Sequence, residues 1–195
     1  MSRGKRHKAE SQLQPEGTIV SGGFIQVFGL GVLIKGDSGI GKSETALELI
    51  SRGHHFISDD VTLVQKSKTG KIMGVSPDLS RFFMEIRGLG IINIKEIFGT
   101  RAISQKAEIN LVVQMKKWEE GKEYDRLGLK FYEEFKILDA KIPQISIPVA
   151  PGRNMATLME VASKVHILKA SGYHAPEDLT KKLAKALVSN KTAKK

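Results

Sequence analysis

The sequence predicts an α/β domain with a β-rich first half and a helical C-terminus, and three observations point to this class. Short apolar runs bounded by glycines fill much of residues 18–114, and such runs favour strands over helices. A glycine-rich loop stands between one apolar run and a segment with helical spacing. Beyond residue 154, apolar side chains recur at the spacing of amphipathic helices. A chain of 195 residues is long enough to bury a core of its own.

The elements of the first half follow from these runs. Each strand is rich in β-branched or aromatic residues and is closed by glycine or by a polar turn, such as residues 66–71. The helix carries Ala46, Leu49 and Ile50 on one stripe and ends near Gly53, a residue suited to a C-cap. In order, we expect strands at 18–20, 24–28 and 32–35, a helix at 44–52, and strands at 56–58, 61–64, 72–75 and 82–86.

The second half contains one clear strand at 109–114, followed by a charged stretch over 116–136. Residues 137–147 predict two short strands separated by Pro143, because proline cannot donate a hydrogen bond to a sheet ladder. The loop 148–154 contains proline and glycine. It leads into helices predicted at 154–169 and 178–189.

The net charge of +10 comes mostly from the two ends of the chain. Residues 1–16 carry +2 and residues 181–195 carry +6, so the part between them is almost neutral. A basic face for nucleic acid is therefore not expected within the domain. Residues 1–16 mix charge, Gln and Pro without periodicity and predict a disordered basic N-terminus, whereas residues 176–195 predict a C-terminal helix and a basic tail.

The chain has no cysteine, which excludes a disulfide framework, a cysteine nucleophile and a thiolate metal site. Its apolar runs are far shorter than the roughly 20 residues of a membrane-spanning helix. No apolar segment follows the basic N-terminus, as a secretory signal would require. We therefore expect a soluble cytoplasmic protein with no membrane partner.

Residues Gly36-Asp37-Ser38-Gly39-Ile40-Gly41-Lys42-Ser43 fit the phosphate-loop pattern G-x-x-x-x-G-K-[ST] in full, between an apolar strand and a helix. Glycines let backbone N–H groups turn toward phosphate oxygens, and the N-terminus of the following helix adds a partial positive charge. Lys42 is expected to bridge the β- and γ-phosphates, and the Ser43 hydroxyl is expected to ligate Mg²⁺. The loop therefore predicts a nucleoside triphosphate site without specifying a reaction.

Two adjacent carboxylates follow the strand at 56–58. Because neighbouring residues on a strand point to opposite faces, Asp59 and Asp60 are expected to have distinct tasks. One could hold Mg²⁺ and the other could accept a hydroxyl proton as a general base. An Asp-Asp turn without catalytic work explains the pattern equally well.

Several blocks of this chain, in order along it, resemble the HPr kinase/phosphorylase family. The resemblance runs from about Thr18 to Tyr173, and a chance match of so many collinear blocks is far less probable than a chance phosphate loop. The blocks are Gly36–Ser43 with the following Glu44-Thr45-Ala46-Leu47, Arg52-Gly53-His54, Asp59-Asp60, Glu85–Asn93, Asp125–Gly128 and Pro148–Asn154.

The resemblance implies a bifunctional enzyme. The family uses ATP and Mg²⁺ to phosphorylate a serine of HPr, the small phosphocarrier of the bacterial sugar phosphotransferase system. It also reverses the modification, with inorganic phosphate attacking the phosphoserine to give pyrophosphate. The family's core contains a P-loop and is similar to phosphoenolpyruvate carboxykinase, and its members assemble as hexamers. Residues 17–175 would then form the catalytic kinase/phosphorylase domain.

By the same resemblance, Asp59 would be the catalytic acid/base, together with Lys42 at the phosphates. Asp60 and Glu85 would be Mg²⁺ ligands or lie close to the metal. Arg126 would stabilise negative charge on the transferring phosphoryl group, a task for which a fixed guanidinium is well suited.

Two further arginines have open roles. Arg153 is expected to bind phosphate or position the substrate, and a structural role within its loop is nearly as plausible. For Arg87, a role in positioning phosphate competes with a salt bridge to Glu85 or to a neighbouring subunit.

Two departures from the family matter. Ser21 stands where the family has a histidine thought to assist the catalytic aspartate, and serine cannot titrate near neutral pH. His54 and His55 lie after the helix and are expected to be cap or surface residues rather than replacements. The chain also lacks the N-terminal domain usual in the family, so it is either a naturally short member or a trimmed piece.

Two other functions remain open from the sequence. One is a kinase with the same core acting on free serine, another small molecule or another protein. The other is an ATP-binding regulatory protein with little turnover, for which Asp59 would be dispensable.

Overall fold

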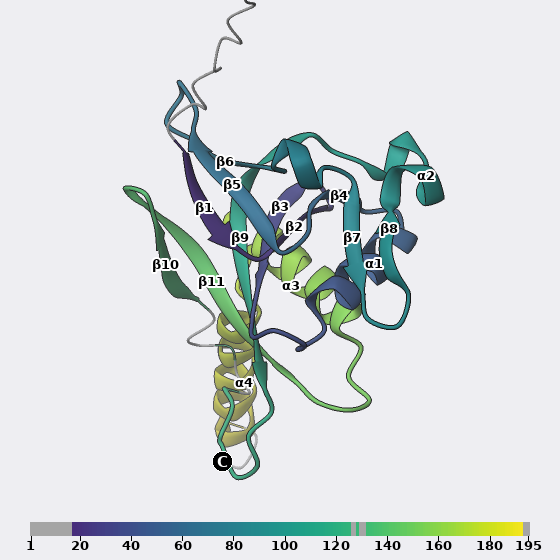
Figure 1. The fold of residues 1–195 in the computed structure, drawn as a ribbon. Coiled ribbons are helices and arrows are strands. Elements are labelled where there is room, and N and C mark those ends of the chain that lie inside the picture. The colour runs from purple at the N-terminus through teal and green to yellow at the C-terminus, as the bar shows by residue number, and fades with distance from the viewer. Residues whose placement is uncertain (1–16, 126–127, 129–131, 193–195) are drawn as a thin grey trace, which may run out of the picture.

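One long strand, β9 (Lys106–Lys117), organises the sheet in the computed structural model, which describes residues 17–125, 128 and 132–192. Along one edge, β9 pairs in parallel with β3 (Leu30–Lys35). Along the other edge it pairs first with β6 (Ile72–Val75), antiparallel, and then with β11 (Ala140–Val149), in parallel. Beyond β9 the sheet therefore divides into an upper wing that begins with β6 and a lower wing that begins with β11 (Figure 1).

The remaining strands extend the sheet from these pairs. Next to β3, β2 (Gly23–Val27) pairs antiparallel with both β3 and β4 (His55–Ser58). In the upper wing, β5 (Val61–Lys66) joins β6 to β1 (Gly17–Ser21). In the lower wing, β10 (Glu133–Ile137) pairs with β11. Strand directions are thus mixed, and the α/β class with a β-rich first half is confirmed.

A small hairpin stands apart from the large sheet. It consists of β7 (Phe83–Ile86) and β8 (Gly90–Asn93), and it leads into the short helix α2 (Ile94–Phe98). Short 3₁₀ turns flank this region at Asp78–Ser80 and Thr100–Ala102. Figure 1 shows the hairpin beside α1, so it lies close to the phosphate loop.

Three longer helices complete the fold: α1 (Lys42–Ser51), α3 (Met155–Ala170) and α4 (Ala175–Thr192). Helices α1 and α3 cover one face of the sheet, and their apolar side chains share a core with Val32 and Ile34 of β3. A second core on the other face contains Leu33. Because β3 is buried on both faces, it has the continuous apolar sequence that leads into the phosphate loop. No helix in the described part of the chain is long and apolar enough to cross a bilayer.

The prediction of two short strands around Pro143 is wrong. Residues 140–149 form a single strand, and Ile137 belongs to the preceding strand, β10. At Pro143, β11 has a neighbour on one side only, because its pairing with β9 begins at Gln144. The missing N–H therefore need not interrupt a ladder on both edges.

The other differences are additions and shifts of ends. Strands β8 and β10 and helix α2 were not expected, and α4 begins at Ala175 rather than Asp178. Most side chains of β10 are exposed or only partly buried, so its charged sequence lacks the apolar alternation of a strand. The predictions for residues 1–16 and for Arg126 lie outside the described residues.

Candidate active site

The loop of residues 36–43 joins β3 to α1, and its glycines determine its shape. Gly39 (φ 78°) and Gly41 (φ 99°) adopt left-handed conformations that glycine reaches without strain. At Gly36, an added Cβ would lie 2.8 Å from the Met115 carbonyl oxygen, so the chain passes too close to β9 for a larger residue. Lys42 Nζ donates to the carbonyl oxygens of Gly36 (3.1 Å) and Asp37 (3.2 Å). The ammonium group therefore lies back over the loop.

A polar cavity opens beside this loop. Its walls come from the phosphate loop, from the turn between β4 and β5, and from the β7–β8 hairpin, which are separated in the sequence but adjacent here. The cavity thus brings together most of the residues that the sequence singled out. It is lined by Ser38, Gly39, Gly41, Lys42, Ser43, Glu44, Asp60, Glu85 and Arg87.

Asp59 lies between the loop and the hairpin. Its carboxylate accepts hydrogen bonds from Ser43 Oγ at 3.0 and 3.3 Å and from the Glu85 backbone N–H at 3.2 Å. Burial and the negative charge of Asp60 raise the pKa of Asp59 to about 6, against the opposing effect of these hydrogen bonds. A carboxyl group tuned in this way is ionised at neutral pH and can still take up a proton.

Asp60 is placed differently because the two aspartates lie in a turn rather than on a strand. Asp60 has φ 56°, a left-handed conformation, and its backbone oxygen accepts from the Gly22 N–H at 2.7 Å. Its side chain is exposed at the cavity, whereas Asp59 is partly buried against Ser43. The two carboxylates therefore differ in environment because of a turn, and the argument from strand alternation was wrong.

Arg87 reaches the phosphate loop from the hairpin. Its Nη2 donates to Ser38 Oγ at 3.3 Å. Its guanidinium packs so closely on Gly39 that an added Cβ there would lie 2.6 Å from Nη1. The ion pairs among the described residues do not include one between Arg87 and Glu85. This contact with the loop could not be foreseen from the sequence, since the two residues are 49 positions apart.

Ser21 lies next to the aspartate turn. It is the last residue of β1, where it pairs with Val61 of β5, and its carbonyl oxygen accepts from Lys35 Nζ at 3.3 Å. The following Gly22 donates to the Asp60 backbone. Ser21 is therefore close to the aspartate pair along the backbone, and its side chain is exposed.

Arg153 and His54 are engaged elsewhere. Arg153 Nη1 donates to the Pro148 carbonyl oxygen at 2.7 Å, and its guanidinium carbon lies 5.8 Å from the Trp118 ring centre. It is not among the residues that line the cavity. His54 is buried against Glu160 of α3, with 2.9 Å between Nε2 and Oε1, as part of a cluster that the sequence did not predict.

Comparison with known families matches residues 12–183 to the model of the HPr Serine kinase C-terminal domain. This chain belongs to that family. The resemblance found in the sequence blocks is thereby confirmed, and it covers the phosphate loop, the aspartate turn and the hairpin that together form the cavity.

Two relatives of this chain carry the name HPr kinase/phosphorylase. The HPr kinase/phosphorylase of Thermoanaerobacter sp. (strain X514) is 47% identical over 178 residues, which cover 91% of this chain and 58% of that protein. The HPr kinase/phosphorylase of Bacillus subtilis (strain 168) is 46% identical over 175 residues, which cover 90% and 56%. The chain therefore spans less than two thirds of the length of these relatives.

A solved structure of the HPr(Ser) kinase/phosphatase from Coxiella burnetii has the same fold. It matches with a TM-score of 0.75 at 32% identity, covering 83% of this chain and 98% of that chain. The large mixed sheet with its C-terminal helices is therefore the architecture of this family.

Proposed function

We propose that this domain is an ATP- and Mg²⁺-dependent protein serine kinase whose substrate is HPr, and that it also catalyses phosphorolysis of the phosphoserine. The observation that carries the proposal is the position of Asp59, which accepts from the phosphate-loop Ser43 and has its pKa raised to about 6. The names of the relatives supply the substrate and the two directions. The mixed sheet is compatible with a core similar to phosphoenolpyruvate carboxykinase, which remains part of the proposal.

The cavity fits a nucleoside triphosphate with a hard cation. Ser43, Asp60 and Glu85 present a hydroxyl and two carboxylates at one cavity, and Mg²⁺ prefers such oxygen ligands together with phosphates and water. Among the described residues no cluster of three or more acidic or histidine side chains forms a self-sufficient metal site. This is expected where the nucleotide supplies the remaining ligands. The metal would supply charge neutralisation at the phosphates.

In the kinase direction, Asp59 accepts the proton of the substrate serine hydroxyl as the serine oxygen attacks the γ-phosphorus and ADP leaves. Lys42, Arg87 and the backbone of the loop stabilise charge on the phosphates. Arg126, which lies outside the described residues, would add a guanidinium at the transferring group. A pKa near 6 suits this task, since Asp59 is then ionised at neutral pH without being a negligible base.

In the reverse direction, an oxygen of inorganic phosphate attacks the phosphorus of phosphoserine, and pyrophosphate forms. Asp59 returns the proton to the leaving serine oxygen, as microscopic reversibility requires. The same residue thus serves both directions. We further propose that the domain acts in the cytoplasm and assembles as a homohexamer. Light scattering of the purified protein measures its mass and so tests the hexamer directly.

Ser21 favours one competing function, a kinase of the same core acting on free serine or another small molecule, since the family histidine is absent at this position. Incubation with labelled ATP and Mg²⁺, in parallel with purified HPr and with free serine, separates the two. Label on HPr is expected. Label on serine but not on HPr would overturn the proposal, and nucleotide binding without any transfer would favour a regulatory ATP-binding protein.

A further inference from the structure

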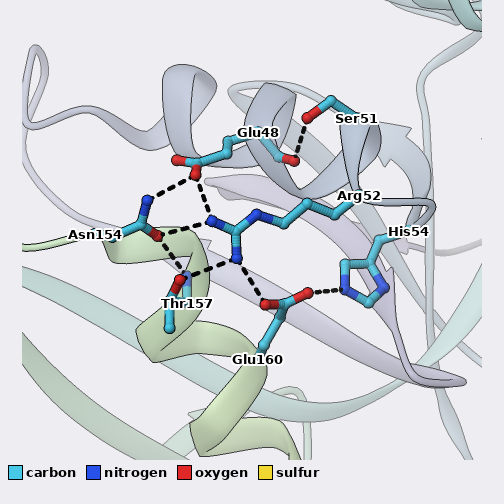
Figure 2. Close-up of polar contacts among 7 residues, drawn as sticks. All are labelled: Glu48, Ser51, Arg52, His54, Asn154, Thr157 and Glu160. Carbon is cyan, nitrogen blue, oxygen red and sulfur yellow. Dashed lines mark hydrogen bonds and ion pairs between the residues drawn. The ribbon is translucent and has the colours of Figure 1, made fainter.

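A second polar cluster lies at the opposite end of α1 from the cavity. Figure 2 shows Arg52, directly after the last residue of α1, directed toward the N-terminal turns of α3. Its side chain is 30% exposed, and four partners surround its guanidinium. We call Glu48, Arg52, Asn154, Thr157 and Glu160 the α1–α3 joint.

Arg52 contacts both helices at once. Its Nη2 lies 2.5 Å from Glu48 of α1 and 3.2 Å from the Asn154 side-chain oxygen. Its Nη1 lies 2.7 Å from Glu160 and 3.0 Å from the Thr157 hydroxyl, both on α3. A planar guanidinium with fixed donors can hold several acceptors in one geometry, which a lysine ammonium on a flexible stem does less well.

Asn154 makes the contact with α1 specific. Its side-chain oxygen caps α3 by accepting from the Thr157 N–H at 2.7 Å, and its Nδ2 donates to Glu48 at 2.7 Å. The two helices are therefore joined in both directions, through Arg52 and through the amide of Asn154. The hydrogen bond from Asn154, followed by the hydrogen bond and the positive charge of Arg52, holds the pKa of Glu48 below its usual value.

A buried histidine, His54, also contacts the joint. Glu160 is shared between Arg52 and His54, whose side chain is only 7% exposed and meets the Phe28 ring edge-on at 4.8 Å between centroids. Charges also suit the helix ends: Arg52 lies at the C-terminus of α1, and Glu48 lies beside the N-terminus of α3. Such a saturated network allows little movement between the two helices.

The joint connects the phosphate-loop helix to α3. Helix α1 begins with Lys42 and Ser43 at the cavity. Asn154 caps α3 and donates to Glu48 of α1, so the phosphate-loop helix has a fixed place relative to α3.

We propose that Arg52 and Asn154 are positioning residues that hold the phosphate-loop helix α1 at a fixed place relative to α3, as phosphoryl transfer requires. The inference rests on the proposed kinase function. Neither residue touches the reacting groups. Both act by keeping α1 and α3 in one rigid unit, and small misplacements of reacting parts reduce turnover strongly.

Asn154→Asp tests the joint without removing the helix cap. Aspartate keeps the oxygen that caps α3 and accepts from Arg52, but it replaces the amide donor with a carboxylate oxygen 2.7 Å from Glu48. We expect kcat for HPr phosphorylation to fall about tenfold, with the KM for ATP changed less than about threefold. All assays are run at a temperature at which circular dichroism shows every variant to be folded.

The double variant Glu48→Gln/Asn154→Asp removes the contact between two carboxylates and restores the net charge of the joint. Because Glu48 Oε1 accepts from both Asn154 and Arg52, the exchange does not restore both hydrogen bonds, and the variant should regain part of the lost kcat. Gln144→Glu is the matched control, since the Gln144 amide of β11 donates to Glu133 at 2.9 Å outside the cavity, and this change also sets two carboxylates side by side. It should leave kcat unchanged.

Hydrogen exchange on the same proteins gives a readout independent of turnover. Asn154→Asp should speed amide exchange in peptides covering 48–54 and 150–157, and the double variant should slow it again. Wild-type kcat in Asn154→Asp, or a loss of which the folded double variant regains no part, would overturn the inference. An inactive wild type would instead refute the proposed function, and unchanged exchange would then refute the joint as well.

Discussion

The two ends of helix α1 differ in how many side-chain partners surround them. At its N-terminus, Gly41 offers no side chain to cap the helix, and Ser43 faces a cavity. At its C-terminus, Arg52 is surrounded by side chains of α1 and α3. The first end leaves room for a ligand to supply the missing partners, and the second is already satisfied. A phosphate-loop helix therefore needs an open binding end and a fixed support.

The largest expected effect is at the open end. Asp59→Asn removes the proposed base while keeping a side chain of the same shape beside Ser43. We expect transfer to fall by about 10³-fold or more in both directions, while ATP affinity changes little. Initial rates with HPr and with phosphorylated HPr measure the loss, and calorimetry measures ATP binding. Near-normal rates would show that Asp59 is not the base.

A matched pair of serines compares the two ends directly. Ser43→Ala removes the proposed Mg²⁺ ligand and the donor to Asp59, so kcat/KM should fall about 100-fold. Ser51→Ala removes a hydroxyl that donates to the Glu48 carbonyl oxygen at the other end of the same helix. It should change kcat/KM less than about twofold. Equal losses in the two variants would contradict the division into a binding end and a supporting end.

The C-terminal end of α1 should contribute more to the stability of the protein than its N-terminal end. Arg52→Ala leaves Glu48 and Glu160 without the cation that both contact, and it should lower the melting temperature by more than Ser43→Ala does. Thermal melts of this variant and of Ser43→Ala provide the comparison. An equal melting temperature for wild type and Arg52→Ala would refute the supporting role.

The open end, by contrast, carries a stability cost that depends on pH. Because the folded state raises the pKa of Asp59 from 3.8 to about 6, folding is penalised as pH rises through this interval, and the penalty is constant above it. Asp59→Asn should therefore be more stable than wild type by about 3 kcal/mol at pH 7.5. The gain should vanish below about pH 3, where Asp59 is protonated in both states.

Melts of nucleotide-free wild type and Asp59→Asn across this pH range measure the difference. If the variant is less stable than wild type at pH 7.5, and the difference in stability does not change on acidification, the raised pKa of Asp59 is contradicted.

The same contrast explains what could be predicted from the sequence. The open end is a local motif, since backbone shape and residue spacing within eight positions define it, and its strand and helix neighbours were predicted. The joint depends on residues such as Arg52 and Glu160, which are 108 positions apart. Tertiary packing alone brings them together, and the sequence analysis named Arg52 only at the end of a predicted helix and in the block Arg52-Gly53-His54.

The errors in the fold have the same origin. Pro143 suggested a break because its local chemistry disfavours a ladder, yet β11 is continuous since its neighbours differ along its length. Strand β10 was not predicted because its charged side chains are mostly exposed and give no apolar alternation. Likewise, the contact of Arg87 with Ser38 depends on where the β7–β8 hairpin folds, which spacing along the chain does not encode.

The smallest expected effect concerns Ser21. Its neighbour Gly22 donates to the Asp60 backbone, so a histidine at position 21 would lie near the aspartate turn. Ser21→His should raise the rate about two- to tenfold if proton handling there is limiting. Ser21→Gln, which adds a polar side chain that does not titrate, is the control. An equal gain from glutamine, or none from histidine, would contradict this explanation.

Mass spectrometry of HPr tests the central claim most directly. HPr incubated with this protein, ATP and Mg²⁺ should gain one phosphoryl group on a serine. After ATP is removed, excess inorganic phosphate should take that group away and release pyrophosphate in equal amount. HPr that stays unmodified, while the protein binds ATP and is folded, would contradict the account.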